Sequence, residues 1–472
     1  MTSPPAPRTL PSDVSVVNVG LPLFADALRD QGRPVDQLDW RIPANGDPRL
    51  IAALTTLLGD HTSQIDAANA EVFRRLDTGT PFWTTVTTVG DALPGRGPRT
   101  LWHCGPAIEW PQVCDPLRRS MRAATVAEGW AADVAEVDTL LRTGRVELEP
   151  ANPDAMVVPM ATALGPSMPV LVVDNREGGT RAFSAVNQGS GDVAWFGRES
   201  DAAIERLRFL RDVAGPLLAT AVRQSGPVDV LSLAAQGLAM GDDVHMRTQA
   251  STNLLIRHLL PQLVAAPGPA AVEFARYLSA DHLFFLNLAM AAAKSLTMWA
   301  EQVEGSSIVT TMARNGTTFG VRLAGSPTWF LNDAPEIGDA LYKPGFGPGS
   351  GARDIGDSAV LELIGLGGAA AAGSPAVAAF LGGTMADAAA VTENMTDVCH
   401  GPSSRFKLPT LDMRGTPVGV DARLVAKLGQ TPKVNTGILH VSDGSGQVGA
   451  GVATAPLGCF TDAVLDLAHR LA

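Results

Sequence analysis

The most apolar run of the chain, residues 283–299, places the strongest limit on how this sequence folds. The run carries Asn287 and Lys294 and directly follows Asp281 and His282. Amide and ionisable side chains are costly at membrane depth, and a spanning helix needs about 20 apolar residues. The sequence therefore predicts a buried helix in a globular core, and no association with a membrane.

Length, composition and charge narrow the class of protein. A chain of 472 residues is too long for one simple core, so about two to four domains are expected. Hydrophobic residues make up 46% and charged residues 18%, which is typical of a globular chain. The formal net charge of −12 argues against a nucleic-acid binder, which needs a basic face. Small anionic substrates remain compatible, because local arginines can bind them.

Cysteine and histidine positions indicate neither a disulfide framework nor a metal site. The four cysteines have no close metal-type pairing: Cys104, Cys114, Cys399 and Cys459. Free cysteine is usually a buried small side chain, and the scattered histidines have no ligand spacing. We expect no metal and no cofactor. The first residues lack the apolar core of a signal peptide, so a cytoplasmic protein is expected.

Helix and strand patterns predict an α/β (α+β) fold with several parts. In residues 13–43 two β-branched runs flank a helical run, which predicts a βαβ-like unit. A further helix is expected at about residues 62–78. The predicted regions are a disordered tail at 1–12, an N-terminal α/β region at 13–205, a helical region at 206–304 and a glycine-rich C-terminal α+β region at 305–472.

One short stretch holds a dense group of titratable side chains. Gly241 permits a tight turn, and Asp242, Asp243, His245 and Arg247 follow directly. A glycine turn, then Asp at an expected helix start, presents polar groups from a rigid support. The stretch therefore predicts anion binding and proton transfer. The alternative is an N-capping aspartate followed by surface charges.

A second group of candidates lies at turns in the C-terminal region. Arg314 and Asn315 precede Gly316, and Asn-Gly is a strong hairpin-turn dipeptide. Arginine binds carboxylate or phosphate in a bidentate manner, as a small oxyanion substrate requires. A solvated turn is the alternative. Asp357 is a further candidate, with N-capping as its alternative.

Glycine-rich segments supply backbone donors for an anion. Gly367 and Gly368 lie in a partial dinucleotide-binding pattern. The acidic residue that should follow about 20 positions later is missing, so close packing of elements is the alternative. Asn435 and Gly449 lie in segments able to form an anion nest, with plain turns as the alternative. The chain has no GxxxxGK[ST] and no GxSxG motif.

A series of ordered segments over about residues 100–470 carries a family resemblance. The segments are LWHCGPAIEWPQVCDPLRRSMRAATVAEGWA, PSMPVLVVDN, QGLAMGDDVHMRT, DHLFFLNLAMAAAK, TTMARNGTTFGVR, IGDSAV, GLGGAAAA, VNTGILH and GQVGAGVATAPL. On these the chain resembles the DUF1116 family, whose characterised member is the AllG-type subunit of oxamate carbamoyltransferase. The leading segment VVNVGLPLFADALRDQGRPVDQLDWRIPA is similar to a short module of the acyl-CoA-synthetase-like partner subunit in that system.

The resemblance implies a carbamoyltransferase role in ureide (allantoin) nitrogen metabolism. The family reaction interconverts oxalurate plus phosphate with oxamate plus carbamoyl phosphate. The resemblance also implies an assembly with the acyl-CoA-synthetase-like subunit and a third, smaller subunit. Carbamate kinase would act downstream on carbamoyl phosphate. For this chain itself we expect a homo-oligomer.

The candidate residues suit phosphorolysis of a ureide. The reaction needs a cationic site for phosphate, donors for a developing oxyanion, and an acid near the departing nitrogen. The expected roles are anion binding by Arg314 and Arg247, proton transfer by His245 oriented by Asp242 or Asp243, and oxyanion donation by Asn315, Gly367 and Gly368. Asp357, Asn435 and Gly449 are further candidates for substrate binding.

Residues 152–168 depart from the family pattern. Where the family has a His-His segment followed by VGPMAG, this chain has NPDAMVVPMATALGPSMP, and Val158 and Thr162 replace glycines. Branched side chains fill space that glycine leaves for a ligand. Ala313 also replaces the usual Thr before Arg-Asn-Gly. We expect residues 152–168 to decide the substrate. A related transferase or hydrolase with a changed acceptor, or a non-catalytic scaffold subunit, are the alternatives.

Overall fold

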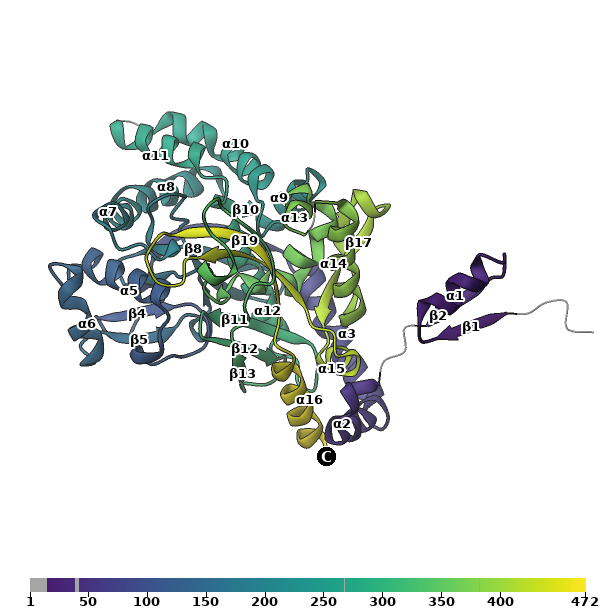
Figure 1. Cartoon of the computed structure of the whole chain (residues 1–472). Coiled ribbons are helices and arrows are strands. Elements are labelled where there is room, and N and C mark those ends of the chain that lie inside the picture. Colours follow the sequence, from purple (N-terminus) through teal and green to yellow (C-terminus); the bar gives the residue numbers. More distant parts are fainter. Residues whose placement is uncertain (1–14, 39–41, 267, 382) are drawn as a thin grey trace, which may run out of the picture.

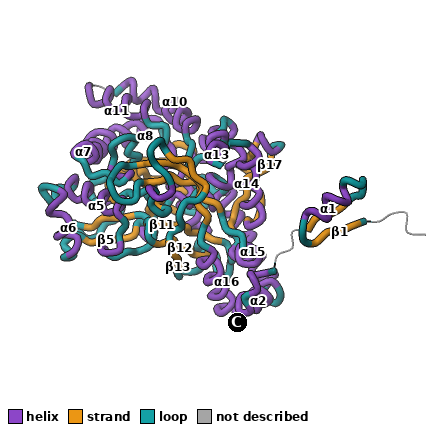
Figure 2. Tube along the Cα trace, in the orientation of Figure 1, coloured by secondary structure: helices purple, strands orange, loops and turns teal. Residues whose placement is uncertain are grey.

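The computed structural model describes residues 15–38, 42–266, 268–381 and 383–472. Figures 1 and 2 show helices and strands mixed along the chain, with the strands in several separate sheets. The predicted α/β (α+β) class is confirmed. The expected region boundaries at 205/206 and 304/305 stay predictions. The expected tail at 1–12 lies outside the described residues.

The first described residues form a small module that Figure 1 shows apart from the other elements. Strand β1 (Val16–Val19), helix α1 (Pro22–Arg29) and strand β2 (Val35–Leu38) form it, and β1 pairs with β2 in parallel. This confirms the predicted βαβ-like unit within residues 15–38; part of its predicted second strand, at 39 and 40, lies outside the described residues. Only Ala25 of α1 is buried, so the module has almost no core.

Helix α12 (Phe284–Ala300) is the buried helix that the apolar run predicted. It packs against β8 (Pro169–Asn175) and β9 (Thr180–Ala185) in a five-stranded sheet of order β10-β3-β8-β9-β6. The other strands are β3 (Pro81–Thr88), β6 (Met156–Val157) and β10 (Val228–Asp229). All neighbours in this sheet are antiparallel except β6 and β9. The sheet and α12 lie in the larger of the hydrophobic cores.

A second small sheet and its helices contribute to the same core. Its order is β5-β4-β7, with β4 (Thr100–His103), β5 (Glu147–Pro150) and β7 (Ala163–Leu164). Helix α5 (Asp115–Ala127) packs on β4 and β7, and α6 (Val134–Arg142) packs on α5. The segment between β5 and β7 therefore runs from one sheet to the other, because β6 belongs to the central sheet. That segment contains most of the divergent residues 152–168.

Helices dominate the chain from residue 201 to 300, as expected. They are α7 (Asp201–Phe209), α8 (Gly215–Ser225), α9 (Val230–Ala239), α10 (Gln249–Ala265), α11 (Pro269–Ala280) and α12. A π turn at Leu210–Ala214 lies between α7 and α8. Pro216 follows that turn, and proline cannot donate the helical hydrogen bond, which accounts for the irregularity.

Among the described residues, one bent pair of helices approaches the hydropathy of a membrane span. Across the described ranges, no single helix has both the length and the apolar character of a span. Helices α11 and α12 meet the criterion only as a pair bent by 80°.

The glycine-rich C-terminal region builds three further sheets. Strands β11 (Val309–Asn315) and β12 (Thr318–Leu323) form the hairpin predicted at Asn315-Gly316, in a sheet of order β13-β12-β11-β15. The other strands of this sheet are β13 (Phe330–Asp333) and β15 (Ile355–Gly356). The second sheet has the order β14-β19-β18, with β14 (Asp339–Tyr342), β18 (Lys433–Leu439) and β19 (Gln447–Thr454). The third sheet is the pair of β16 (Cys399–Leu408) and β17 (Arg414–Val420).

The first helix after the module at 15–38 packs on the last helices of the chain. Helix α2 (Pro48–Leu58) packs against α16 (Leu457–Leu471) in the second hydrophobic core. The predicted helix at 62–78 is confirmed as α3 (Thr62–Thr78). The other helices are α4 (Val89–Ala92), α13 (Pro375–Phe380), α14 (Met385–Val398) and α15 (Ala422–Leu428). The glycine-rich segment Gly367–Gly373 is a buried 3₁₀ turn, so it does not open an α-helix as a dinucleotide-binding pattern requires.

Candidate functional site

The titratable stretch lies in a loop between α9 and α10. Helix α10 begins at Gln249, so the stretch precedes the helix that the sequence expected directly after Gly241. Inside the loop Val244 has a φ of 60°, a conformation that β-branched residues rarely adopt. Its amide donates to the carbonyl of Arg247 at 3.0 Å. Such strain persists only where the surroundings enforce it and is frequent at functional sites.

Asp242 caps helix α10 from a distance. Its carboxylate accepts from the Ala250 amide at 3.2 Å, the Ser251 amide at 2.8 Å and the Ser251 hydroxyl at 2.9 Å. These amides belong to the first turn of α10, where backbone donors have no helical acceptor. Burial raises the pKa of Asp242 above its ordinary value. Its contacts match the capping alternative that the sequence left open.

Asp243 organises the loop itself. Its carboxylate accepts from the amides of Met246 at 3.1 Å and Arg247 at 2.7 Å. The Asn435 amide group donates to the same carboxylate at 2.6 Å, across 192 positions of sequence. Two residues that the sequence singled out separately, Asp243 and Asn435, are therefore direct partners in the buried interior.

His245 has a different partner from the expected one. Its Nδ1 lies 2.7 Å from Glu362 Oε1, and both side chains are buried, 3% and 0% exposed. The sequence predicted orientation by Asp242 or Asp243, but both aspartates turn back onto backbone amides. Glu362 was missed by the sequence analysis. A single carboxylate within the apolar run 359–366 is the signal that could have found it.

The Glu362 carboxylate gathers several of the predicted residues. Its Oε1 also accepts from the amides of Gly368 and Asn435, each at 3.1 Å, while Oε2 is buried without a partner among the described residues. Gly367 has a φ of 59°, and a Cβ there would lie 2.1 Å from Glu362 Oε1. Glycine is thus required for the close approach, and its amide donates to the Asp243 carbonyl at 2.8 Å.

His245 also lines a small cavity of about 30 Å³. The cavity wall consists of Pro159, Met160, Trp195, Phe196, His245, Met246, Leu283, Leu286, Ser358, Gly437 and Gln447. Such a volume holds about one water molecule. Pro159 and Met160 come from the divergent residues 152–168, so this segment forms part of the wall that His245 faces.

Arg314 is committed to internal partners. Its Nε and Nη2 donate to the two oxygens of Asp354 at 2.8 and 3.0 Å, and Nη1 donates to the Gly356 carbonyl at 2.7 Å. The Thr436 hydroxyl donates to Asp354 at 2.9 Å. Arg314 and Asp354 are both fully buried. The predicted anion-binding guanidinium has, in this conformation, all three nitrogens engaged, because the fork matches the Asp354 carboxylate.

Asp357 and Asn315 form hydrogen bonds with backbone groups of other segments. Asp357 accepts from the amides of Gly105 at 2.8 Å and Val158 at 3.0 Å. Burial raises the pKa of Asp357 to about 6, despite these bonds and the nearby Arg314. The Asn315 amide donates to the Pro106 carbonyl at 2.9 Å. Both residues thus bind backbone groups of segments distant in sequence, and Asn315 Oδ1 also accepts from the amides of Thr317 and Thr318 in its own turn.

The remaining predicted residues lie at the edge of the group. Arg247 is 34% exposed, and its Nη1 donates to the Gly241 carbonyl at 2.7 Å. Gly449 lies within the ladder of β19, opposite Tyr342 on one side and Ile438 on the other. We call the buried group of Asp243, His245, Arg314, Asp354, Asp357, Glu362 and Asn435 the closed centre. The predicted residues outside it are Asp242, Arg247, Asn315, Gly367, Gly368 and Gly449.

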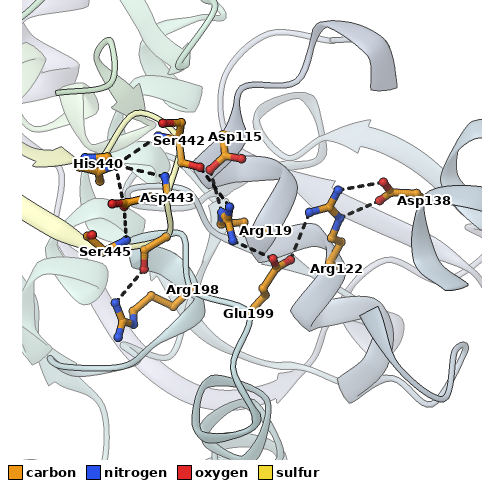
Figure 3. A network of polar contacts seen from close by, with 11 residues as sticks. Asp115, Arg119, Arg122, Asp138, Arg198, Glu199, His440, Ser442, Asp443 and Ser445 are labelled. Carbon is orange, nitrogen blue, oxygen red and sulfur yellow. Dashed lines mark hydrogen bonds and ion pairs between the residues drawn. The ribbon is translucent and has the colours of Figure 1, made fainter. Parts of the chain in front are cut away.

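Two arginines bind the backbone of the loop between β18 and β19 (Figure 3). Arg119 donates to the Ser442 carbonyl at 3.1 Å, and Arg198 donates to the Gly444 carbonyl at 2.7 Å. Arg119 also pairs with Asp115 and Glu199, and Figure 3 shows the chain of ion pairs continuing beyond Glu199. Because Gly437 and Gln447 line the cavity, this fastened loop connects two of its wall elements.

The described part of the chain contains no side-chain cluster suited to a metal ion and no disulfide bond. Within residues 15–38, 42–266, 268–381 and 383–472 no group of three or more His, Cys, Asp or Glu side chains is arranged to hold a metal ion. The four cysteines are free, and three of them are buried: Cys104, Cys399 and Cys459.

Comparison with known proteins relates the chain to one family. Residues 146–358 match the family model described as "Oxamate carbamoyltransferase subunit AllG". A protein of Escherichia coli with that same description is 36% identical over 416 residues, covering 87% of this chain and 99% of the relative. The uncharacterized protein YahG of Escherichia coli is 32% identical over 461 residues, 97% of this chain and 98% of the relative.

A solved structure has the same fold. The crystal structure of a conserved protein of unknown function from Enterococcus faecalis V583 superposes with a TM-score of 0.84 at 31% identity. The match covers 87% of this chain and 99% of that one. The extent and identity of these matches show that the chain belongs to the AllG family, the family of the oxamate carbamoyltransferase subunit AllG.

Proposed function

We propose that this chain is a carbamoyltransferase-type enzyme subunit. It transfers a carbamoyl group between a small ureide-like carboxylate of the oxalurate/oxamate type and phosphate. The observation that carries the proposal is the buried His245–Glu362 pair facing a cavity, within a chain related to an oxamate carbamoyltransferase subunit. We place the reaction in the cytoplasm, in allantoin-type ureide degradation.

His245 acts as the proton-transfer residue in this proposal. Phosphate oxygen attacks the carbamoyl carbon of the ureide, the carbon–nitrogen bond breaks, and the departing amide nitrogen takes up the proton that phosphate gives up. Glu362 holds Nδ1 of His245, which leaves Nε2 to relay that proton, since a carboxylate at one imidazole nitrogen fixes the role of the other. Glu362 is then a positioning residue.

The anion-binding roles need a change of conformation. Arg314, Gly367 and Gly368 already donate to internal acceptors, and a cavity of about 30 Å³ cannot hold a ureide. Arg247, partly exposed, is the predicted cation with the fewest internal bonds. We propose that release of the β18–β19 loop from Arg119 and Arg198 opens the cavity.

The small volume of the cavity also favours a second candidate function. A subunit whose site has room for only about one water molecule in isolation fits a scaffold or shared-site role, with catalysis completed by a partner. The Escherichia coli relative is described as a subunit, and we propose an acyl-CoA-synthetase-like partner and a third small subunit here as well. A homo-oligomer of this chain remains part of the proposal.

Steady-state kinetics with and without partner subunits tests both candidates. We expect carbamoyl phosphate formation from oxalurate and phosphate by the mixture, and a loss of about 10²–10⁴-fold in His245→Gln. Glu362→Gln should reduce kcat while KM changes little, because the positioning of His245 is lost. Turnover by the mixture that is equal in wild type and His245→Gln would support the scaffold role. Absence of any turnover by the mixture would sink the enzyme proposal.

A further inference from the structure

A second hollow, open to solvent, lies beside the closed centre. It has a volume of about 400 Å³, and its lining includes Asn152, Lys294, Glu301, Arg322 and Trp329. Lys294 comes from α12, Arg322 from β12, and Asn152 from the divergent residues 152–168. We call this hollow the lysine pocket. None of its charged residues was among the predicted site residues.

Lys294 lines the lysine pocket, and its ammonium group has more N–H donors than the described residues supply acceptors. Its side chain is 2% exposed, and its Nζ donates to Asn152 Oδ1 at 2.9 Å. An ammonium group has three N–H donors, and the described residues supply no further acceptor within hydrogen-bond distance. Burial lowers the pKa of Lys294, against the attraction of Glu301 and Asp357. An unfilled buried cation is costly, so the position favours an acceptor from outside.

Arg322 adds a second cation to the same hollow. Its Nη1 lies 3.3 Å from Glu301 Oε1, and its Nη2 donates to the Ser326 carbonyl at 3.4 Å. Its Nε is buried without a partner among the described residues. The guanidinium also lies over the Trp329 ring, 5.8 Å from its centroid. Glu301 is the sole carboxylate among the lining residues, so the lysine pocket has an excess of positive charge when both cations are protonated.

The lysine pocket is separate from the cavity at His245 but mechanically connected to it. Leu286 lines the cavity, and Lys294 lies eight positions later on the same helix, about 12 Å along its axis. Residues 152–160 run from one hollow to the other, with Asn152 in the lysine pocket and Met160 at the cavity. Asp357 fixes the middle of that segment through the Val158 amide.

We propose that the lysine pocket binds a small oxyanion, a carboxylate or a phosphate, between Lys294 and Arg322. The anion fills the free donors of Lys294 and balances the positive excess that Glu301 leaves. The Asn152 side chain, fixed by its bond to Lys294, presents its NH₂ group beside the ammonium as a neutral donor. This site lies outside the closed centre and goes beyond the proposed function, since it holds whether or not the chain transfers a carbamoyl group.

Isothermal titration of the full-length chain with inorganic phosphate and, separately, with oxamate tests the proposal at constant ionic strength. Lys294→Met removes the ammonium while keeping an unbranched side chain, and we expect about ten- to hundredfold weaker binding of whichever anion binds the wild type. Arg322→Gln, as a second variant, should weaken the same binding. Lys407→Met is the matched control, because Lys407 lies on β16 outside the lysine pocket and donates to the Ser403 carbonyl; its affinity should equal that of the wild type.

The two titrations also distinguish the source of the oxyanion. Binding of phosphate alone identifies a phosphate site, and binding of oxamate alone identifies a carboxylate site. Either result, lost in Lys294→Met and Arg322→Gln, supports the proposal. Equal affinity in wild type and both variants, no binding of either anion, or an equal loss in Lys407→Met would overturn it.

Discussion

The closed centre and the lysine pocket both contain buried charges, but they differ in how many hydrogen-bond partners the protein itself supplies to these charges. In the closed centre Arg314 meets Asp354 as a complete fork, and Glu362 meets His245. In the lysine pocket Lys294 has one hydrogen bond and a solvent-open hollow beside it. The same chain segment, residues 152–160, forms a wall of both. The Arg314–Asp354 charges, satisfied from within, stabilise the fold, whereas an unfilled cation at an open hollow favours binding of a ligand.

Breaking the Arg314–Asp354 pair should produce the largest effect on stability. Arg314→Met leaves Asp354 buried and without the fork, and we expect the free energy of unfolding to fall by about 3–5 kcal/mol. Urea denaturation followed by circular dichroism measures the change. The matched control is Arg181→Met, which removes an exposed fork to Asp174 and should cost at most about 1 kcal/mol. Similar losses in both variants would show that burial does not distinguish the two pairs.

The pH dependence of stability should reveal Asp357, the residue of the closed centre that accepts from the Val158 amide. Burial raises its pKa from 3.8 to about 6 in the folded chain, so the folded state binds the proton more tightly than the unfolded state. The contribution to stability is therefore complete below about pH 4 and is lost as the pH rises through about 6. At roughly 1.4 kcal/mol per pKa unit, the loss is about 3 kcal/mol.

Denaturation series from below pH 4 to pH 8, in wild type and Asp357→Asn, check this expectation. The variant should lack the part of the decrease that begins near pH 4 and levels off near pH 6. Burial raises the pKa of Asp281 to about 7, so a decrease that continues to about pH 7 should remain in Asp357→Asn and disappear in Asp281→Asn. An unchanged pH profile in Asp357→Asn would contradict the assignment of the lower transition.

How far the sequence predicted this arrangement depends on the range of the interactions. The module at 15–38, helix α3 and the Asn315-Gly316 hairpin follow from local periodicity and turn chemistry, and all three are confirmed. The buried helix α12 also followed from its apolar run. These elements need only neighbours in sequence to be recognised.

The partners inside the closed centre could not be predicted in the same way. Glu362 lies 117 positions from His245, and Asn435 lies 192 positions from Asp243. Which carboxylate meets the imidazole depends on how the glycine-rich 3₁₀ turns fold over the loop at 240–248. The local sequence pattern favoured Asp242 or Asp243 as the partner of His245, because such a pattern contains no information on long-range contacts. For the same reason Lys294 was recognised only as a polar position in an apolar run.

Substitution of Asp242 should have a smaller effect on the free energy of unfolding. It also distinguishes a helix-capping role of this carboxylate from a catalytic one. Asp242→Ala removes the three bonds to Ala250 and Ser251, and we expect a loss of about 2 kcal/mol, the upper end for a helix cap. Asp229→Ala, at the exposed cap of α9, should cost about 1 kcal/mol. Asp242→Asn, which keeps one acceptor oxygen, should retain turnover of the assembled enzyme. A large loss of kcat in a stable Asp242→Asn protein would instead indicate a catalytic carboxylate.

Lys294→Met should produce the smallest change, and its sign should be opposite to that of Arg314→Met. Removing a buried cation that has one hydrogen bond relieves its desolvation cost, so we expect the free energy of unfolding to rise by about 1 kcal/mol in phosphate-free buffer. Added phosphate or oxamate should then stabilise the wild type and leave the variant unchanged, because a ligand that binds only the folded state raises stability by mass action. Thermal unfolding with and without each anion measures both effects. A decrease in stability comparable to that of Arg314→Met would place Lys294 among the internally satisfied charges and remove the distinction between the two regions.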